Sequence, residues 1–126
     1  MSFSNKKVAI FGATSHIAKG LIINFSITGK KYELFLFARL LERVKDFLKS
    51  IQYEKDIHLR GFEEFENEKY DVVINCIGIS STVDFKDKVP SYFRLTETFD
   101  NLVLDYIENH PDTLYIYFSS GAAYGI

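Results

Sequence analysis

The sequence predicts an α/β fold in which helices cover both faces of a parallel β-sheet. Short apolar runs alternate along the chain with longer stretches whose apolar positions recur at helical spacing. The short runs are apolar at consecutive positions, which is typical of strands buried on both faces of a parallel sheet. Regular alternation of such strands with helices is the pattern of an α/β domain.

Each expected strand is a short apolar run, and each expected helix lies between two of them. We expect strands at Val8–Phe11, Leu34–Phe37, Ile57–Leu59, Val72–Ile74 and Leu114–Phe118. We expect helices from Ser15 to Ile27, from Leu40 to Ile51 and from Ser91 to Asn109, with a short helix near Glu63. Right-handed crossovers and the doubly wound pattern predict the strand order 3-2-1-4-5, which is a Rossmann-type sheet.

Apolar residues at helical spacing indicate the buried faces of the first two helices. In the first helix these residues are Ile17, Leu21, Ile22 and Phe25. In the second helix they are Leu41, Val44, Phe47, Leu48 and Ile51.

The composition fits one cytoplasmic domain over residues 1–126. The chain is 47 % hydrophobic and 25 % charged, with a formal net charge of −2, which is ordinary for a globular protein. Its basic residues are scattered among acidic ones, so we expect no nucleic-acid partner. Every apolar stretch is far shorter than the ~18 residues that a membrane span requires, so we expect no membrane partner. A single cysteine cannot form an internal disulfide.

The first strand leads into Gly12-Ala13-Thr14-Ser15-His16-Ile17-Ala18, which we interpret as a dinucleotide phosphate loop. Gly12 permits a tight turn, and the small residues after it let the backbone approach a pyrophosphate. The N-terminus of the helix supplies unpaired N–H groups and the positive end of the helix dipole. We expect the cofactor to contact Gly12, Thr14, Ser15, His16 and Ile17. The alternative is a purely structural turn.

Arginines follow the second strand, where NAD-binding proteins have a carboxylate that accepts from the ribose 2′-OH. Arg39 and Arg43 present guanidinium donors instead, and arginine binds phosphate through paired donors. The sequence therefore favours NADP(H), with NAD(H) as the alternative. Arg39 could also simply solvate the start of the second helix. Phe62, after the third strand, is expected to be a core aromatic, with adenine stacking as the alternative.

These motifs resemble those of the short-chain dehydrogenase/reductase superfamily, in particular its extended branch of nucleotide-sugar epimerases and dehydratases. The loop after the first strand is similar to the glycine-rich loop of that family. Ala18 stands in place of its third glycine and is small enough for the same close helix–strand packing. Asn75-Cys76-Ile77-Gly78 resembles the family's Asn-Asn-Ala-Gly segment. The resemblance implies that Asn75 braces the sheet and that Gly78 lets the backbone pass close to the cofactor. We expect cofactor contacts from Asn75, Cys76, Ile77 and Gly78, with Cys76 as a buried packing thiol.

The segment Ser119-Ser120-Gly121-Ala122-Ala123-Tyr124-Gly125 resembles the extended branch's Ser-Ser-x-x-x-Tyr-Gly. The resemblance implies that Ser120 is catalytic and hydrogen-bonds the substrate oxygen undergoing oxidation or reduction. The family's general acid/base is a tyrosine followed four residues later by lysine, and this sequence contains no such pair. We therefore expect an N-terminal fragment of a family member, truncated after the fifth strand and inactive alone.

Two functions are consistent with these features. The first is the NAD(P)-binding portion of an oxidoreductase, or of a nucleotide-sugar epimerase/dehydratase, acting by hydride transfer on a nucleotide sugar or a small carbonyl substrate. The second is a non-catalytic dinucleotide-binding sensor or interaction module, in which cofactor occupancy changes partner binding. In addition, an uncovered fifth strand would favour pairing with a second copy, so we expect a homodimer or aggregation.

Overall fold

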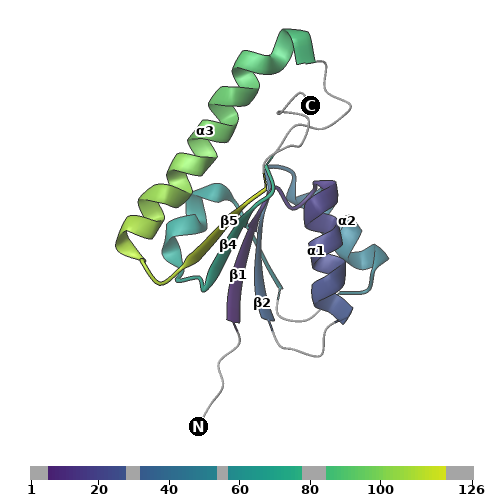
Figure 1. The fold of residues 1–126 in the computed structure, drawn as a ribbon. Helices are drawn as coiled ribbons and strands as arrows, with labels where there is room; N and C mark the ends of the chain where they lie inside the picture. Colours follow the sequence, from purple (N-terminus) through teal and green to yellow (C-terminus); the bar gives the residue numbers. More distant parts are fainter. Residues whose placement is uncertain (1–5, 28–31, 54–56, 78–84, 119–126) are drawn as a thin grey trace.

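A computed structural model describes residues 6–27, 32–53, 57–77 and 85–118, without the side chains of residues 85–96. Its strands are β1 (Lys6–Phe11), β2 (Tyr32–Phe37), β3 (Ile57–Arg60), β4 (Val72–Asn75) and β5 (Leu114–Tyr117). Its helices are α1 (His16–Ile27), α2 (Leu41–Ser50), the 3-10 helix η1 (Phe62–Asn67) and α3 (Phe85–Asn109). The strands form a five-stranded parallel sheet in the order β3-β2-β1-β4-β5 (Figure 1). The predicted α/β class and strand order are confirmed.

The start of α3 differs from the expectation. The expected start was Ser91. The helix instead begins at Phe85 and includes Pro90. Within a helix, a proline has no N–H to donate and its ring crowds the carbonyl of the preceding turn, yet α3 continues through Pro90.

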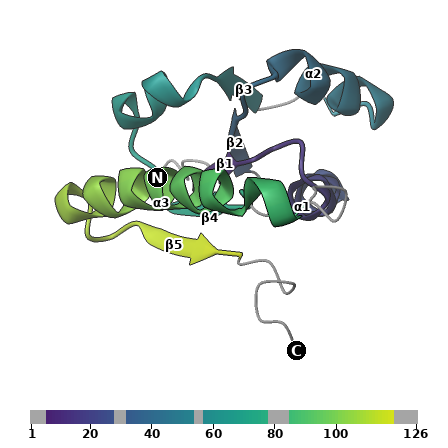
Figure 2. The ribbon, with the colours of Figure 1, turned by 90° about the horizontal axis from the view of Figure 1, so that it is seen from above.

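The helices form two layers, one on each face of the sheet (Figure 2). On one face, α1 and α2 bury small and branched residues against the strands: Ala18, Ile22, Val44 and Leu48 pack with Val8, Ile10, Leu34, Leu36 and Ile74. On the other face, η1 and α3 complete a largely aromatic core: Phe65, Val103 and Tyr106 pack with Phe11, Phe35, Phe37, Tyr70 and Val73. Each large side chain buried in this way contributes about 1.5–3 kcal/mol to stability.

The expected buried face of α2 is confirmed, and that of α1 needs one correction. Val44 and Leu48 are buried, and the other expected residues of α2 pack against the same core. In α1, however, Ile17 is 45 % exposed, and Ala18 is fully buried in its place. A small residue at this position lets the first turn of the helix approach β1 closely, which turns Ile17 to the flank.

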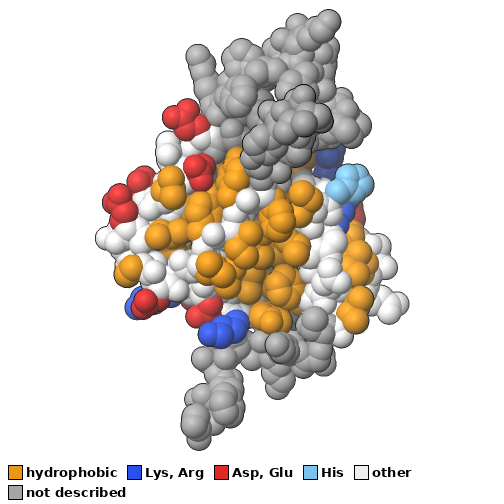
Figure 3. Space-filling model, viewed as in Figure 1, with side chains coloured by type: hydrophobic (Ala, Val, Ile, Leu, Met, Phe, Trp, Pro, Cys, Tyr) orange, Lys and Arg blue, Asp and Glu red, His pale blue; other side chains and the backbone are white. Residues whose placement is uncertain are grey.

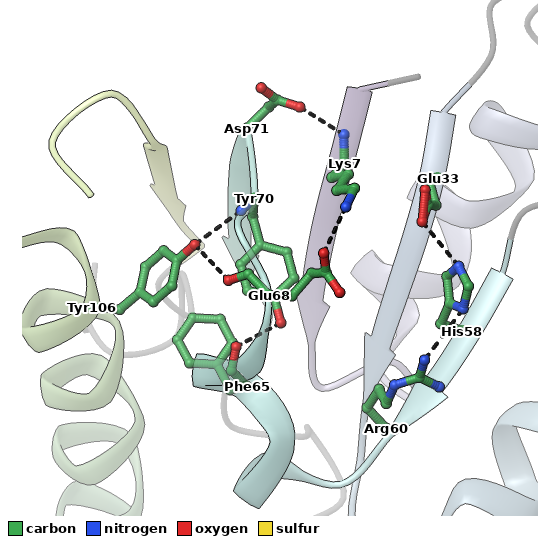
Figure 4. A network of polar contacts seen from close by, with 9 residues as sticks. All are labelled: Lys7, Glu33, His58, Arg60, Phe65, Glu68, Tyr70, Asp71 and Tyr106. Atoms are coloured by element: carbon green, nitrogen blue, oxygen red, sulfur yellow. Dashed lines mark hydrogen bonds and ion pairs between the residues drawn. The ribbon is translucent and has the colours of Figure 1, made fainter. Parts of the chain in front are cut away.

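A polar network closes the amino-terminal end of the sheet (Figure 4). Lys7 Nζ lies 2.6 Å from Glu68 Oε1, and His58 Nε2 lies 3.1 Å from Glu33 Oε1. The hydrogen bond between Lys7 and Glu68 raises the pKa of Lys7 and lowers the pKa of Glu68. Because these groups are about one-third exposed, the pair adds little stability.

Hydrophobic side chains gather on the surface over β4 and β5 (Figure 3). Val72, Ile116 and Phe118 are only partly buried, and Leu114 is 57 % exposed. Within the described part of the chain, no helix covers this end of the sheet on the α1 side. Among the residues that the structure describes, no helix is long and apolar enough to cross a membrane.

Candidate functional site

The candidate site lies at the carboxyl ends of β1, β2 and β4. In a doubly wound sheet, ligands bind beside the point where the strand order reverses. That point lies between β1 and β4, which are neighbours in the sheet. Phe11 and Asn75, the last residues of these strands, are register partners. The loops that follow the two strands therefore meet here.

Gly12 forms the turn between β1 and α1. Its φ of +73° lies in the left-handed region, which residues with a Cβ rarely adopt. A Cβ on Gly12 would lie 3.1 Å from the backbone of both Cys76 and Ile77. The backbone segments after β1 and β4 are thus packed against each other, and only glycine fits between them.

The backbone N–H groups of the loop fall into two sets. Gly12 and Ala13 both donate to the carbonyl of Phe37, at 3.0 and 3.3 Å, and so tie the loop to the end of β2. The N–H groups of Thr14, His16 and Ile17 have no acceptor among the described residues. They stand at the N-terminus of a 12-residue helix, where unpaired donors and the helix dipole favour an anion.

Ser15 fixes where α1 begins. Its Oγ accepts from the backbone N–H of Ala18 at 3.2 Å, which is the geometry of an N-cap. Its own N–H donates to the carbonyl of Gly12 at 2.9 Å. The serine hydroxyl therefore orients the helix terminus.

The two arginines expected near a 2′-phosphate lie beside the carboxyl end of β2. Ala38, the first residue after the strand, is buried, whereas Arg39 is exposed. Arg43 lies in the first turn of α2 and is also exposed. Neither guanidinium has an ion-pair partner in the part of the chain that the structure describes.

Asn75 is the one buried polar side chain among the described residues, with 1 % of its surface exposed. Its Nδ2 donates to Tyr115 Oη at 3.1 Å, and its Oδ1 accepts from the N–H of Ile77 at 3.0 Å. Tyr115 in turn donates to Asp100 Oδ1 at 2.7 Å. Burial raises the pKa of Tyr115 above its ordinary value, and the contact with Asp100 adds to this rise. Asn75 therefore braces the end of β4 against β5 and α3.

Cys76 is buried, with 3 % of its surface exposed. Burial raises the pKa of its thiol to about 11, so the thiol is protonated at neutral pH. Because the thiolate is the nucleophilic form of cysteine, these properties suit packing rather than nucleophilic catalysis.

Phe62, at the start of η1, packs into the aromatic core. Its ring centroid lies 5.1 Å from that of Phe11 and 4.4 Å from that of Phe99. These contacts support the core role over the adenine-stacking alternative.

Two residues expected in the site, Gly78 and Ser120, lie outside the described residues, as does the whole segment 119–126. Their roles remain predictions. In the described part, no group of three or more His, Cys, Asp or Glu side chains could hold a metal ion.

Sequence reasoning missed Tyr115 and Asp100. Tyr115 lies in an apolar run that predicts a strand, where a tyrosine is expected to contribute its ring to the core. Asp100 lies 15 residues earlier, in a helix with many charged positions. A buried tyrosine hydroxyl needs a partner, and that need was the only available signal.

Comparison with solved structures identifies several proteins of similar fold. A short-chain dehydrogenase/reductase from Veillonella parvula matches 97 % of this chain with a TM-score of 0.61 and 15 % identity. A lactate dehydrogenase from Eimeria maxima, solved with NADH and oxamate, matches 96 % with a TM-score of 0.59 and 19 % identity. Gre2 from Candida albicans, in complex with NADPH, matches 94 % with a TM-score of 0.57 and 17 % identity.

These similarities establish the fold as Rossmann-like. The chain spans 50 % of the Veillonella protein and 38 % of the Eimeria protein. No protein-family model matches the sequence, and a search of the curated proteins finds no match.

Proposed function

We propose that this chain binds a nicotinamide dinucleotide at the carboxyl ends of β1, β2 and β4. The observation that carries the proposal is the turn at Gly12. It delivers the N–H groups of Thr14, His16 and Ile17, which have no acceptor among the described residues, to the point where the strand order reverses. Such a strand–turn–helix unit is suited to hold a pyrophosphate.

The residues around the turn fit such a cofactor. The unpaired N–H groups would hold the diphosphate, and the exposed Arg39 and Arg43 would hold a phosphate on the ribose of the adenosine half. The absence of a Cβ at Gly12 lets the phosphate loop pack directly against the backbone after β4. Because two guanidinium groups stand where a carboxylate would select NAD(H), we propose NADP(H) as the preferred cofactor. The similar structures hold NADPH in one case and NADH in another.

The wider proposal is that the chain is the cofactor-binding portion of an oxidoreductase, or of a nucleotide-sugar epimerase/dehydratase. When bound, the cofactor would supply hydride transfer to or from a substrate carbon. Ser120 is proposed to hydrogen-bond the substrate oxygen at that carbon. Two of the similar proteins are a short-chain dehydrogenase/reductase and a lactate dehydrogenase, which supports the redox class.

A second candidate function is a dinucleotide sensor without catalysis. In this function, occupancy of the cofactor site would change the binding of a partner. Both functions require the same cofactor site, and they differ in whether a substrate is turned over. A location in the cytoplasm and self-association through β5 are further parts of the proposal.

Calorimetric titration with NADPH and with NADH tests the cofactor proposal. We expect NADPH to bind more tightly than NADH, by about tenfold or more, because hydrogen bonds to charged groups are strong. Arg39→Asp is expected to abolish this preference. Lys49→Asp is the matched control, because it makes the same charge change at the far end of α2. Equal affinities for the two cofactors would remove the NADP(H) preference, and binding of neither would overturn the proposal.

A further inference from the structure

We propose that Tyr115 and Asp100 are positioning residues for the nucleotide site, through the side chain of Asn75. This inference rests on the proposed function, because it assigns further residues to the same site. Its basis is a continuous chain of hydrogen bonds from α3 to the backbone after β4. These hydrogen bonds connect Asp100 to Tyr115, Tyr115 to Asn75, and Asn75 to the N–H of Ile77.

The direction of every hydrogen bond in this series, from Asp100 to Ile77, is fixed by the groups at its two ends. The backbone N–H of Ile77 can only donate, so the oxygen of the Asn75 amide must face it. The amide nitrogen then faces Tyr115, whose hydroxyl accepts this hydrogen bond. At the other end, the carboxylate of Asp100 can only accept, so the hydroxyl of Tyr115 gives its proton there. A single arrangement satisfies every group, and such aligned chains strengthen each member.

The Ile77 N–H, the last group in this series of hydrogen bonds, forms part of the proposed nucleotide site. Ile77 N and Cys76 C are the atoms that a Cβ on Gly12 would meet at 3.1 Å. The peptide that joins residues 76 and 77 therefore lies directly against the phosphate loop. Its orientation is held on one side by Cys76, whose N–H donates to the carbonyl of Phe11 at 3.0 Å. It is held on the other side by the Asn75 side chain.

Loss of the Tyr115 hydroxyl would release the Asn75 amide while leaving the aromatic ring in place. The amide would then be held at its oxygen alone, by the Ile77 N–H. It could rotate more freely, and the acceptor of the Ile77 N–H would no longer be fixed in place. The peptide against Gly12 would sample other orientations, and the phosphate loop would lose a rigid neighbour. Ligand affinity falls when a preorganised site becomes mobile.

The test compares Tyr115→Phe with Tyr106→Phe. Tyr106 is buried, whereas Tyr115 is half-buried. The hydroxyl of each has two hydrogen-bond partners, and those of Tyr106 are the N–H of Tyr70 and the carbonyl of Glu68. Tyr106 lies at the amino-terminal end of the sheet, away from the nucleotide site (Figure 4). Both variants lose one hydroxyl with two hydrogen-bond partners, so a merely structural role predicts similar effects from both.

Two readouts are measured for each variant: the Kd for NADPH by calorimetry, and hydrogen exchange at the Ile77 amide by NMR. Tyr115→Phe is expected to weaken NADPH binding about fivefold and to accelerate exchange at Ile77. Tyr106→Phe is expected to change neither. An unchanged Kd together with unchanged exchange at Ile77 in Tyr115→Phe would overturn the inference.

Variants of Asp100 keep the inference testable if Tyr115→Phe fails to fold. Asp100→Asn retains an acceptor for the tyrosine proton and is expected to preserve the Kd, whereas Asp100→Ala is expected to weaken binding. Equal affinities of these two variants would count against the role of Asp100.

Failure of the proposed function can be distinguished from failure of this inference. If the unaltered chain binds no dinucleotide, the function proposed above is wrong. Hydrogen exchange at the Ile77 amide, measured without ligand, then tests the inference by itself. Faster exchange in Tyr115→Phe than in Tyr106→Phe would then support the positioning role. Equal exchange in the two variants would overturn it.

Discussion

Gly12 shows how a single residue can define the candidate site. Within the described residues it is the only glycine with a positive φ, and the space for its Cβ is taken by the backbone after β4. The sequence could identify Gly12, because a glycine between a buried strand and a helix has few other uses. Its contact with Cys76 and Ile77 could not be predicted, because they lie more than half the chain away.

Gly12→Ala is expected to destabilise the fold by about 1–3 kcal/mol, because alanine is strained in the left-handed region and its Cβ meets backbone atoms. Gly20 in α1 is the control. A Cβ at Gly20 would meet nothing within 4 Å, so Gly20→Ala is expected to stabilise the helix by about 0.5–1 kcal/mol. Urea denaturation measures both. Effects of the same sign and size would contradict the assignment.

The buried thiol of Cys76 predicts a pH dependence of stability. Burial raises its pKa from 9.0 to about 11. Between these values the unfolded chain releases the proton and the folded chain keeps it, so stability falls as the pH rises through this window. The loss is about 1 kcal/mol at about pH 10.

Cys76→Ala removes this group, and the measurement is the free energy of unfolding at about pH 8 and about pH 10. The unaltered chain is expected to lose about 1 kcal/mol more than the variant between the two pH values. The same pH dependence in both proteins would show that the thiol does not titrate as proposed.

Among the elements, strands were easier to predict from the sequence than helix termini. The apolar runs located each of the five strands that the structure describes, including the edge strands β3 and β5, which are only partly buried. The first turn of α1 was harder. Ile17 fitted the helical periodicity but is exposed, whereas Ala18, at the position of the family's third glycine, packs against the sheet as expected. The start of α3 was also misplaced, since the helix begins at Phe85 rather than at Ser91.

Ser15 is expected to separate the stability of α1 from its proposed ligand binding. Ser15→Ala removes the N-cap acceptor and is expected to lower the free energy of unfolding by about 1 kcal/mol. Ser15→Asp keeps an acceptor and is expected to preserve stability. It also places a negative charge beside the proposed diphosphate, so it should weaken NADPH binding. Tight NADPH binding by Ser15→Asp would argue against a phosphate at this helix terminus.

At the scale of the whole molecule, the strand order could be predicted from the sequence, whereas the side-chain contacts between layers and the extent of the exposed apolar surface could not. Right-handed crossovers and the alternation of elements leave few arrangements of five parallel strands, and the observed order is the one expected. The partners of Asn75 and the extent of the apolar surface over β4 and β5 depend on how the layers pack. Local sequence patterns do not carry that information.

The exposed apolar surface predicts self-association. The β5 strand has neither a charged residue nor a proline, the features that commonly protect a sheet edge. Light scattering is therefore expected to show a mass that rises with concentration. Leu114→Lys is expected to shift the chain toward monomer. Ile27→Lys, which replaces a residue that is 74 % exposed on α1, is expected to have no effect. A clean monomer of the unaltered chain at all concentrations would contradict this prediction.

The central claim is that the phosphates of a dinucleotide bind at the N-terminus of α1. The most direct test is an NMR titration of the backbone amides with NADPH. We predict that the largest shifts occur at Thr14, His16 and Ile17, with smaller ones at Arg39, and that amides at the amino-terminal end of the sheet, such as Lys7 and Asp71, stay unchanged. An absence of shifts at Thr14, His16 and Ile17 at saturating NADPH, or shifts confined to other parts of the chain, would contradict the claim.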